Sequence, residues 1–308
     1  MYDVIIIGGG PAGLTAGIYS CRAMLKTLLF EKSPGGQVAK TDIVENYPGF
    51  PDPIHGLSLM EKMKEQAYKF ELEMKLEEVL RIDVEEKVVK TSKRLYRGRA
   101  IIVATGVEPK KLKVPGEERL FGRGVSYCAI CDGGLFYKRK VVVVGGGDAA
   151  LKEALYLTRF CERVYLIHRR DELGAEKILQ ERAFGNKKLE LIFSSVVREI
   201  KGRDRVSEIL YENLKTKKLS KLKVEGIFPY IGNVPDTDLI DVKKDEEGYI
   251  LTDENMMTSV EGIFAAGDCR SKPVRQITTA VGDGTVAALS VDSYITRVFN
   301  PKSVYAEK

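Results

Sequence analysis

The chain has 308 residues, 44% of them hydrophobic and 30% charged, which excludes a disordered chain, a collagen-like chain and a membrane bundle. At roughly 150 residues per domain, this length corresponds to two domains. The formal net charge of +5 is weak evidence for nucleic-acid binding, and two histidines, His55 and His168, are too few for a histidine-based metal site.

The N-terminal residues lead directly into a predicted strand, without the basic region and long apolar run of a signal peptide. Apolar runs elsewhere are strand-length, far below the ~20 residues that cross a bilayer. Five cysteines in a chain of this size do not form a disulfide framework. We therefore expect a soluble, cytoplasmic protein that binds no nucleic acid, membrane or metal.

The first predicted element is a strand–turn–helix–strand unit over Val4–Lys32. Four β-branched residues are typical of a parallel strand buried on both faces. They are followed by Gly8-Gly9-Gly10-Pro11-Ala12-Gly13 and a helical stretch. Glycines there let a pyrophosphate approach the N-terminus of the helix, and the second strand ends in Glu31, whose carboxylate suits ribose hydroxyls and repels a 2′-phosphate. This unit favours FAD or NAD, with an ordinary glycine turn as the alternative.

Two core elements follow. Met60, Met63, Ala67 and Phe70 have helical spacing and predict core packing. Arg99–Thr105 predicts another buried strand, ending in Ala104-Thr105-Gly106.

The sequence Cys128-Ala129-Ile130-Cys131-Asp132 comes next. Two cysteines separated by two residues can close a small disulfide and lower the pKa of one thiol. A zinc half-site lacks a second ligand pair here, and a structural disulfide is unusual in a reducing cytosol. A redox-active dithiol is favoured. Asp132 could exchange the proton that thiol chemistry requires, or cap the next helix, and both roles could hold together.

A second copy of the first unit follows, because Val141–Arg169 aligns without a gap onto Val4–Lys32. Its turn reads Gly145-Gly146-Gly147-Asp148-Ala149-Ala150, and the position of Glu31 is taken by His168, followed by Arg169 and Arg170. Two guanidiniums suit a 2′-phosphate, so this unit favours NADPH. Exposure of both arginines on a solvated loop is the alternative.

The remaining chain predicts connectors and a return to the first domain. Val107–Glu118 and Gly226–Asp238 are rich in proline and glycine and bracket the second copy, so the second domain is predicted to be inserted into the first. A late strand ends in Gly267-Asp268, whose carboxylate could face the polyol chain of a flavin or cap the next element. Ala280–Tyr294 predicts a closely packed small-residue helix.

Together these motifs resemble the low-molecular-weight thioredoxin reductases, class II members of the pyridine nucleotide-disulfide oxidoreductase family, over essentially the whole chain. The matching segments are Gly8–Gly13, Gly35-Gly36-Gln37, Glu45-Asn46-Tyr47-Pro48-Gly49, Ala104-Thr105-Gly106, Cys128–Asp132, Gly145–Ala150, His168-Arg169-Arg170, Gly267-Asp268 and Arg275-Gln276.

The resemblance implies an α/β fold with two Rossmann-like, three-layer ββα domains. Residues 1–109 and 239–308 would form the FAD domain, and residues 110–238 the inserted NAD(P)H domain with the cysteine pair. It implies a homodimer that reduces thioredoxin, or a thioredoxin-like or glutaredoxin-like protein. Cys131 would face the flavin, Cys128 would attack the partner disulfide, and Asp132 would be the acid/base.

The resemblance also implies cofactor contacts. The FAD contacts would be Gly8, Gly10, Pro11, Ala12, Gly13, Glu31, Lys32, Gly36, Gln37, Val38, Asn46, Val84, Ala104, Thr105, Gly106, Gly267, Asp268, Arg275, Gln276 and Ile277. The NADPH contacts would be Gly145, Gly147, Asp148, Ala149, His168, Arg169 and Arg170. Members of the family that use NADPH usually carry a third arginine where this chain has Gly174, so use of NADH stays open.

The disulfide and the nicotinamide need the same place beside the flavin, and a disulfide packed on the flavin cannot meet a protein substrate. We therefore expect the inserted domain to rotate about the two connectors, as the family implies. Three alternatives remain: a dithiol oxidase, a flavin reductase that uses ferredoxin or another acceptor, and a nucleotide-binding redox sensor. Rapid reduction of the flavin by NADPH would count against the oxidase. Activity that survives Cys131→Ser would favour the flavin reductase, and nucleotide binding with negligible turnover would favour the sensor.

Overall fold

The computed structural model describes residues 1–41 and 43–299, so the last residues of the expected first domain, 300–308, lie outside the described chain. The chain divides into two compact units, Met1–Glu108 with the chain from Val234 on (unit 1), and Pro109–Asn233 (unit 2). It passes between them at β9 (Val107–Pro109) and β17 (Asn233–Pro235), which pair as a two-stranded sheet.

Unit 1 is organised around one twisted sheet with strand order β5-β2-β1-β8-β7-β6, in which β18 also pairs with β8. β1, β2, β5, β8 and β18 pair with one another in parallel, whereas β7 pairs antiparallel with both β8 and β6. The strands are β1 (Tyr2–Ile7), β2 (Thr27–Glu31), β5 (Glu73–Leu76), β6 (Val79–Asp83), β7 (Val88–Thr91), β8 (Leu95–Val103) and β18 (Ile263–Ala265).

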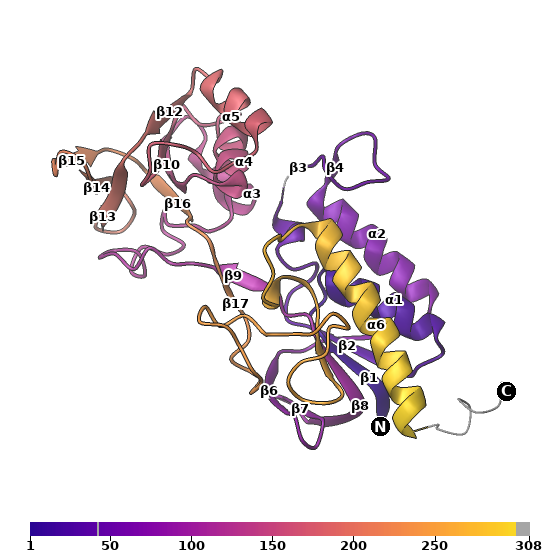
Figure 1. Ribbon diagram of the computed structural model, residues 1–308. Helices are drawn as coiled ribbons and strands as arrows, with labels where there is room; N and C mark the ends of the chain where they lie inside the picture. Colours follow the sequence, from indigo (N-terminus) through magenta and orange to yellow (C-terminus); the bar gives the residue numbers. More distant parts are fainter. Residues whose placement is uncertain (42, 300–308) are drawn as a thin grey trace. The chain divides into compact units, whose positions relative to one another are not determined.

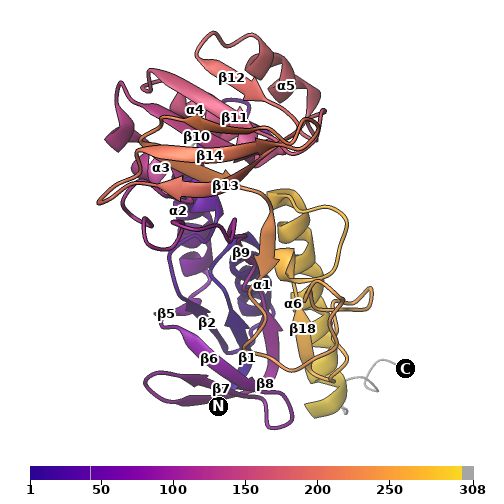
Figure 2. The ribbon, with the colours of Figure 1, turned by 90° about the vertical axis from the view of Figure 1, so that its left-hand side faces the viewer.

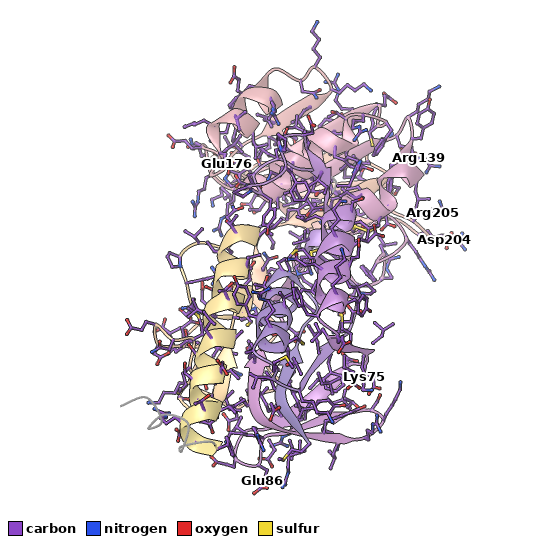
Figure 3. All side chains as sticks on the ribbon, turned by 90° about the vertical axis from the view of Figure 1, so that its right-hand side faces the viewer. Lys75, Glu86, Arg139, Glu176, Asp204 and Arg205 are labelled. Atoms are coloured by element: carbon purple, nitrogen blue, oxygen red, sulfur yellow. A yellow bond between two sulfur atoms is a disulfide. The ribbon has the colours of Figure 1, made fainter. Side chains whose placement is uncertain are left out.

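Helices cover one face of this sheet. Figure 1 shows α1, α2 and α6 side by side, and Figure 3 shows the same layer from another side. Val4 and Ile6 point into the core beneath these helices, while Ile5 and Ile7 point into the core on the other face. The helices are α1 (Pro11–Arg22), α2 (Gly56–Lys69) and α6 (Ile277–Phe299), and the smaller elements are η1 (Val38–Lys40), β3 (Ile43–Val44), β4 (Ile54–His55) and η3 (Gly267–Cys269).

Unit 2 has a four-stranded parallel sheet with strand order β12-β11-β10-β16. A three-stranded antiparallel sheet packs on one of its faces, and helices pack on the other (Figure 2). The parallel strands are β10 (Lys140–Gly145), β11 (Arg163–Ile167), β12 (Leu189–Ile192) and β16 (Gly226–Tyr230). The antiparallel strands are β13 (Ser195–Lys201), β14 (Glu208–Asn213) and β15 (Leu219–Leu222). The helices are α3 (Ala129–Asp132), η2 (Gly133–Phe136), α4 (Asp148–Leu157) and α5 (Lys177–Phe184).

The repeated sequence folds twice into the same unit. Val4 lies opposite Thr27 in one sheet, and Val141 lies opposite Val164 in the other, 23 positions on in each case. The α/β class with two Rossmann-like units, each a helical layer, a parallel sheet and a second β layer, is confirmed.

Part of the second predicted connector is wrong. Gly226–Tyr230 is β16, a buried strand that pairs with β10 as the last strand of the unit 2 sheet. Pro229 suggested a linker because proline cannot donate to a strand ladder, but a strand at the end of a sheet tolerates it. Here Pro229 lies opposite Val144 and is buried. The expected strand Arg99–Thr105 also begins earlier and ends at Val103, and the late helix is longer than Ala280–Tyr294.

Candidate active site

The first glycine turn lies between β1 and α1 and is shaped by the protein's own backbone. Gly8 has φ +120°, and a Cβ there would lie 2.0 Å from the carbonyl oxygen of Ala104. A Cβ on Gly13 would lie 1.8 Å from the oxygen of Gly8. Gly10, by contrast, has open space around it at the N-terminus of α1, where Pro11 occupies the first turn. An unobstructed backbone with free amide groups at the N-terminus of a helix fits an anionic diphosphate.

Glu31 ends β2 beside this turn, and its side chain is buried, with 4% of its surface exposed. Its Oε1 pairs with Lys64 Nζ of α2 at 2.5 Å, while Oε2 is buried without a hydrogen bond. A Cβ on Gly9 would lie 2.6 Å from Oε2. The buried carboxylate therefore keeps one oxygen for a hydroxyl donor such as a ribose. The adjacent Lys32 is exposed and pairs with Glu78 and Glu108.

Predicted residues from distant parts of the chain meet at the carboxyl ends of β1, β2, β8 and β18. Asn46 donates to the side-chain oxygen of Gln276 across 230 positions, at 3.2 Å. Gln37 donates to the oxygen of Val107 at 3.2 Å, and Thr105 donates to the oxygen of Asp236 at 2.6 Å. The carboxyl edge of a parallel sheet is where such folds bind dinucleotides.

The acidic end of β18 is embedded in a charge network. Asp283 of α6 accepts hydrogen bonds from the Gly267 amide at 3.0 Å, from Arg270 at 3.0 Å and from Lys272 at 2.9 Å. Lys272 Nζ also lies 3.4 Å from Asp268 Oδ1, a contact that makes an ion pair but no hydrogen bond. Burial raises the pKa of Asp268 despite this cation. Asp268 thus holds a polar atom that a hydroxyl could satisfy.

The remaining predicted FAD contacts lie around the same edge. Arg275 stacks on the ring of Tyr249 at 3.9 Å, and its buried Nε has no hydrogen bond. Ile277 begins α6, Val38 begins η1 after the left-handed Gly36, and Val84 follows β6. Ala12 lies in α1, and a Cβ on Gly267 would lie 2.8 Å from its Cβ. The loop at Gly106 is open to solvent. These residues fit a dinucleotide cofactor such as FAD.

The second glycine turn, between β10 and α4, repeats the geometry. A Cβ on Gly145 would lie 2.2 Å from the oxygen of Tyr230, while Gly147 is open. Asp148 and Ala149 begin α4, and Asp148 accepts a hydrogen bond from the Glu176 amide at 2.8 Å, which brings the loop before α5 onto the turn. The Glu176 side chain is labelled in Figure 3.

His168 follows β11 at the position of Glu31 and packs against Gly146, where a Cβ would lie 2.3 Å from Nδ1. Its Nε2 is buried without a hydrogen bond, and burial lowers its pKa, with Arg170 and Arg169 adding to the effect. Both arginine side chains are exposed and have no side-chain partner among the described residues. Gly174 donates to the oxygen of Gly146 at 2.8 Å, and the space beside it is open. This loop fits a phosphate-bearing nucleotide.

Cys128 and Cys131 form a disulfide, with Cα atoms 5.3 Å apart. Cys128 is half-buried at the N-cap of α3, and Cys131 is exposed. The Cys131 amide donates to Cys128 Sγ at 3.2 Å, a contact that favours a thiolate on that sulfur once the bond is reduced. Asp132 stands at the N-cap of η2 without a side-chain capping bond, so its carboxylate is not used there.

Two tyrosines hold the cysteine segment. Tyr230 at the end of β16 accepts a hydrogen bond from the Ala129 amide at 3.0 Å. Burial, then the charges of Glu153 and Asp132, raise its pKa, so it stays protonated. Tyr127 donates to the buried Glu117 at 2.6 Å, and its pKa is also raised by burial. The redox segment is thereby tied to the strand next to the second glycine turn.

Sequence reasoning missed Lys64, Lys272, Asp283 and Tyr230. Lys64, Asp283 and Tyr230 meet the site through contacts between different elements, whereas Lys272 reaches Asp268 from four positions on. The one local signal was Asp283, an acid within a helix of small residues. Cys161 and Cys269 are buried, and Cys21 is half-buried against the core. Among the described residues no helix has the length and apolar character to span a membrane, and no three acidic, cysteine or histidine side chains gather as a metal site.

Comparison with known proteins places this architecture in a family. Residues 2–284 match the model of the pyridine nucleotide-disulphide oxidoreductases. The chain is similar to a thioredoxin reductase of Bacillus subtilis, at 49% identity over 96% of this chain and 95% of that protein. It is also similar to one of Treponema pallidum, at 46% identity over 97% and 99%.

Among solved structures, the thioredoxin reductase of Lactococcus lactis superimposes with a TM-score of 0.94 at 44% identity, covering 97% of this chain and 100% of that one. Identity at this level over nearly the full length shows the family. The chain therefore belongs to the pyridine nucleotide-disulphide oxidoreductases, in the group of the low-molecular-weight thioredoxin reductases.

Proposed function

We propose that this protein is a thioredoxin-disulfide reductase, in which unit 1 holds FAD and unit 2 holds NADPH. The observation that carries the proposal is the Cys128–Cys131 disulfide, built onto a unit whose nucleotide turn ends in Arg169 and Arg170. Bound FAD supplies two-electron chemistry, taking up a hydride from a nicotinamide and delivering electrons to a disulfide. FAD and NADPH are the cofactors of this family.

The residues that would hold FAD are the first glycine turn, Glu31, Asp268 and the start of α6. Glu31 Oε2 would accept from a ribose hydroxyl, and Asp268 from the ribityl chain. In unit 2, the second glycine turn would bind the NADPH pyrophosphate, and Arg169 with Arg170 the 2′-phosphate.

In the dithiol, the Cys128 thiolate would attack one sulfur of the partner disulfide and release the other as a thiolate. The Cys131 thiolate would then displace the reduced partner, which re-forms the Cys128–Cys131 bond. Asp132, adjacent to Cys131 and not engaged as a cap, would take and return a proton. Thioredoxin is the proposed partner, and thioredoxin-like or glutaredoxin-like proteins share the required disulfide.

The direct test is steady-state reduction of thioredoxin by the flavin-loaded protein, with NADPH and NADH compared. We expect turnover with NADPH, its loss in Cys128→Ser and Cys131→Ser, and its retention in Cys21→Ala, which changes a cysteine that forms no disulfide. Absence of turnover with either nucleotide, or undiminished activity in a serine variant, would overturn the proposal.

We infer that unit 2 rotates about β9 and β17 between the two half-reactions. The cysteine pair and the nicotinamide site belong to the same unit and need the same flavin. A bifunctional lysine cross-linker that joins the two units should stop turnover while leaving FAD bound. Normal turnover of the cross-linked protein would exclude rotation.

We also infer a homodimer in the cytoplasm. The helical layer of unit 1 exposes apolar side chains that a monomer would leave in water: Tyr19, Leu57, Tyr68, Val286 and Leu289. Cys21, Cys161 and Cys269 are unpaired, which suits a reducing compartment. Light scattering of the flavin-loaded protein should give twice the chain mass of 34.3 kDa. A single-chain mass would exclude the dimer.

A further inference from the structure

Asp171 directly follows the two arginines proposed to bind the 2′-phosphate of NADPH. An exposed carboxylate at this position could pair with either guanidinium and would repel a phosphate. In the structure, the Asp171 carboxylate contacts other side chains instead. Asp171 Oδ1 accepts a hydrogen bond from the Ser194 hydroxyl, and Oδ2 lies 2.5 Å from Lys215 Nζ. Each carboxylate oxygen therefore has a partner other than Arg169 or Arg170.

Ser194 and Lys215 are held in place by backbone contacts of their own. The Ser194 amide donates to the oxygen of Arg170 at 3.1 Å, and the Ser194 oxygen accepts from Leu214 at 2.6 Å. Lys215 lies in the turn between β14 and β15, where its amide donates to Asn213 Oδ1 at 3.1 Å. The turn is thus docked on the loop that carries the arginines.

The pairing has an electrostatic consequence. Lys215 foremost, with Ser194, lowers the pKa of Asp171, so the carboxylate is charged and its charge is offset by the ammonium. Arg169 and Arg170 are left without a side-chain partner among the described residues. Gly174, in the same loop, supplies no further charge, so the two arginines are the cationic side chains that the proposal assigns to the 2′-phosphate.

We propose that Lys215 is a specificity-determining residue for the nicotinamide nucleotide. By holding Asp171, it keeps that carboxylate from competing with the 2′-phosphate for Arg169 and Arg170, and so favours NADPH over NADH. Lys215 is a positioning residue that acts through Asp171. The inference rests on the proposed role of this loop as the NADPH site.

The test compares NADPH with NADH in the flavin-loaded protein. Lys215→Met should raise KM for NADPH about fivefold, the order of effect of one exposed charge pair, and leave kcat and KM for NADH unchanged. Lys215→Arg should keep the wild-type ratio. Lys218→Met is the matched control, since it removes an exposed lysine from the same turn. Calorimetric binding of 2′,5′-ADP should show the same loss without any turnover.

The double variant Asp171→Asn/Lys215→Met separates the mechanism from direct contact. Removal of the carboxylate should restore KM for NADPH towards the wild-type value. An unchanged NADPH/NADH ratio in Lys215→Met, an equal loss for both nucleotides, or no recovery in the double variant would overturn the inference. If Arg169→Ala also left the ratio unchanged, the proposed NADPH site itself would fail. If KM for NADPH rises in the arginine variants but not in Lys215→Met, only the role of Lys215 is rejected.

Discussion

The two glycine turns share one backbone plan but differ in the side chains that follow the second strand of each unit. Both use a strand neighbour to crowd the first glycine, Ala104 for Gly8 and Tyr230 for Gly145. Both leave the third glycine open at a helix N-terminus. At the end of the second strand, the first turn meets a buried acid and the second meets an imidazole with two exposed guanidiniums. The scaffold is therefore common, and we propose that the charge beside it selects the nucleotide.

The largest effect is expected at Gly13, the last small residue of the first glycine turn. The second copy has Ala150, but a Cβ on Gly13 would lie 1.8 Å from the oxygen of Gly8. We expect Gly13→Ala to abolish FAD binding and to destabilise unit 1 by about 3 kcal/mol. The flavin-to-protein absorbance ratio and thermal unfolding measure this. Ala150→Gly is the counterpart and should cost only about 1 kcal/mol. Full flavin content in Gly13→Ala would refute the packing argument.

Removal of both arginines should erase the charge difference between the copies. Arg169→Ala/Arg170→Ala should raise KM for NADPH about a hundredfold, since two charge-assisted contacts are lost, and change KM for NADH little. Paired kinetics with the two nucleotides measure the effect. A parallel rise for NADH would show that the arginines hold the loop rather than the 2′-phosphate.

Glu31 tests the other copy. Glu31→Gln keeps the shape but removes the charge that pairs with Lys64 and accepts from a hydroxyl. We expect FAD affinity to fall about tenfold, with the NADPH/NADH ratio unchanged. Titration of the apoprotein with FAD, followed by flavin fluorescence, measures the affinity. Unchanged FAD binding would place the ribose elsewhere.

A substitution at Gly174 is expected to strengthen the nucleotide preference of the second copy instead of weakening it. The space beside Gly174 is open and its φ is not in the left-handed region, so a side chain fits. Gly174→Arg should add a third guanidinium and raise the preference for NADPH over NADH about fivefold. Gly174→Gln is the neutral control of similar length. If both variants raise the preference equally, charge is not the cause.

The smallest expected effect is a pH dependence of unit 2. Burial holds the pKa of His168 below its ordinary value of 6.5, so the unfolded chain takes up the proton at a higher pH than the folded chain does. Acidification below pH 6.5 therefore favours unfolding, and stability is regained as pH rises through this window. His168→Asn should flatten this part of the thermal stability profile. An unchanged slope would assign the titration to another group.

Much of the site could be read from local sequence. Residue type and spacing over a few positions identify the two glycine turns, Glu31, His168 with its arginines, and the cysteine pair. Tyr230 and Lys64 could not be found this way, because their partners Ala129 and Glu31 lie 101 and 33 positions away. The strand Gly226–Tyr230 was mistaken for a connector because a proline outweighed its apolar pattern.

Local sequence was sufficient to identify two βαβ units, their glycine turns and the chemistry of the residues that end each second strand, because these depend on short-range backbone geometry and side-chain type. The packing of the folded chain establishes which side chains meet at the carboxyl edges of the sheets. There Asn46 reaches Gln276, Lys64 pairs with Glu31, and Lys215 pairs with Asp171. Such contacts depend on how elements pack, and no local pattern encodes the distance between two side chains remote in the chain.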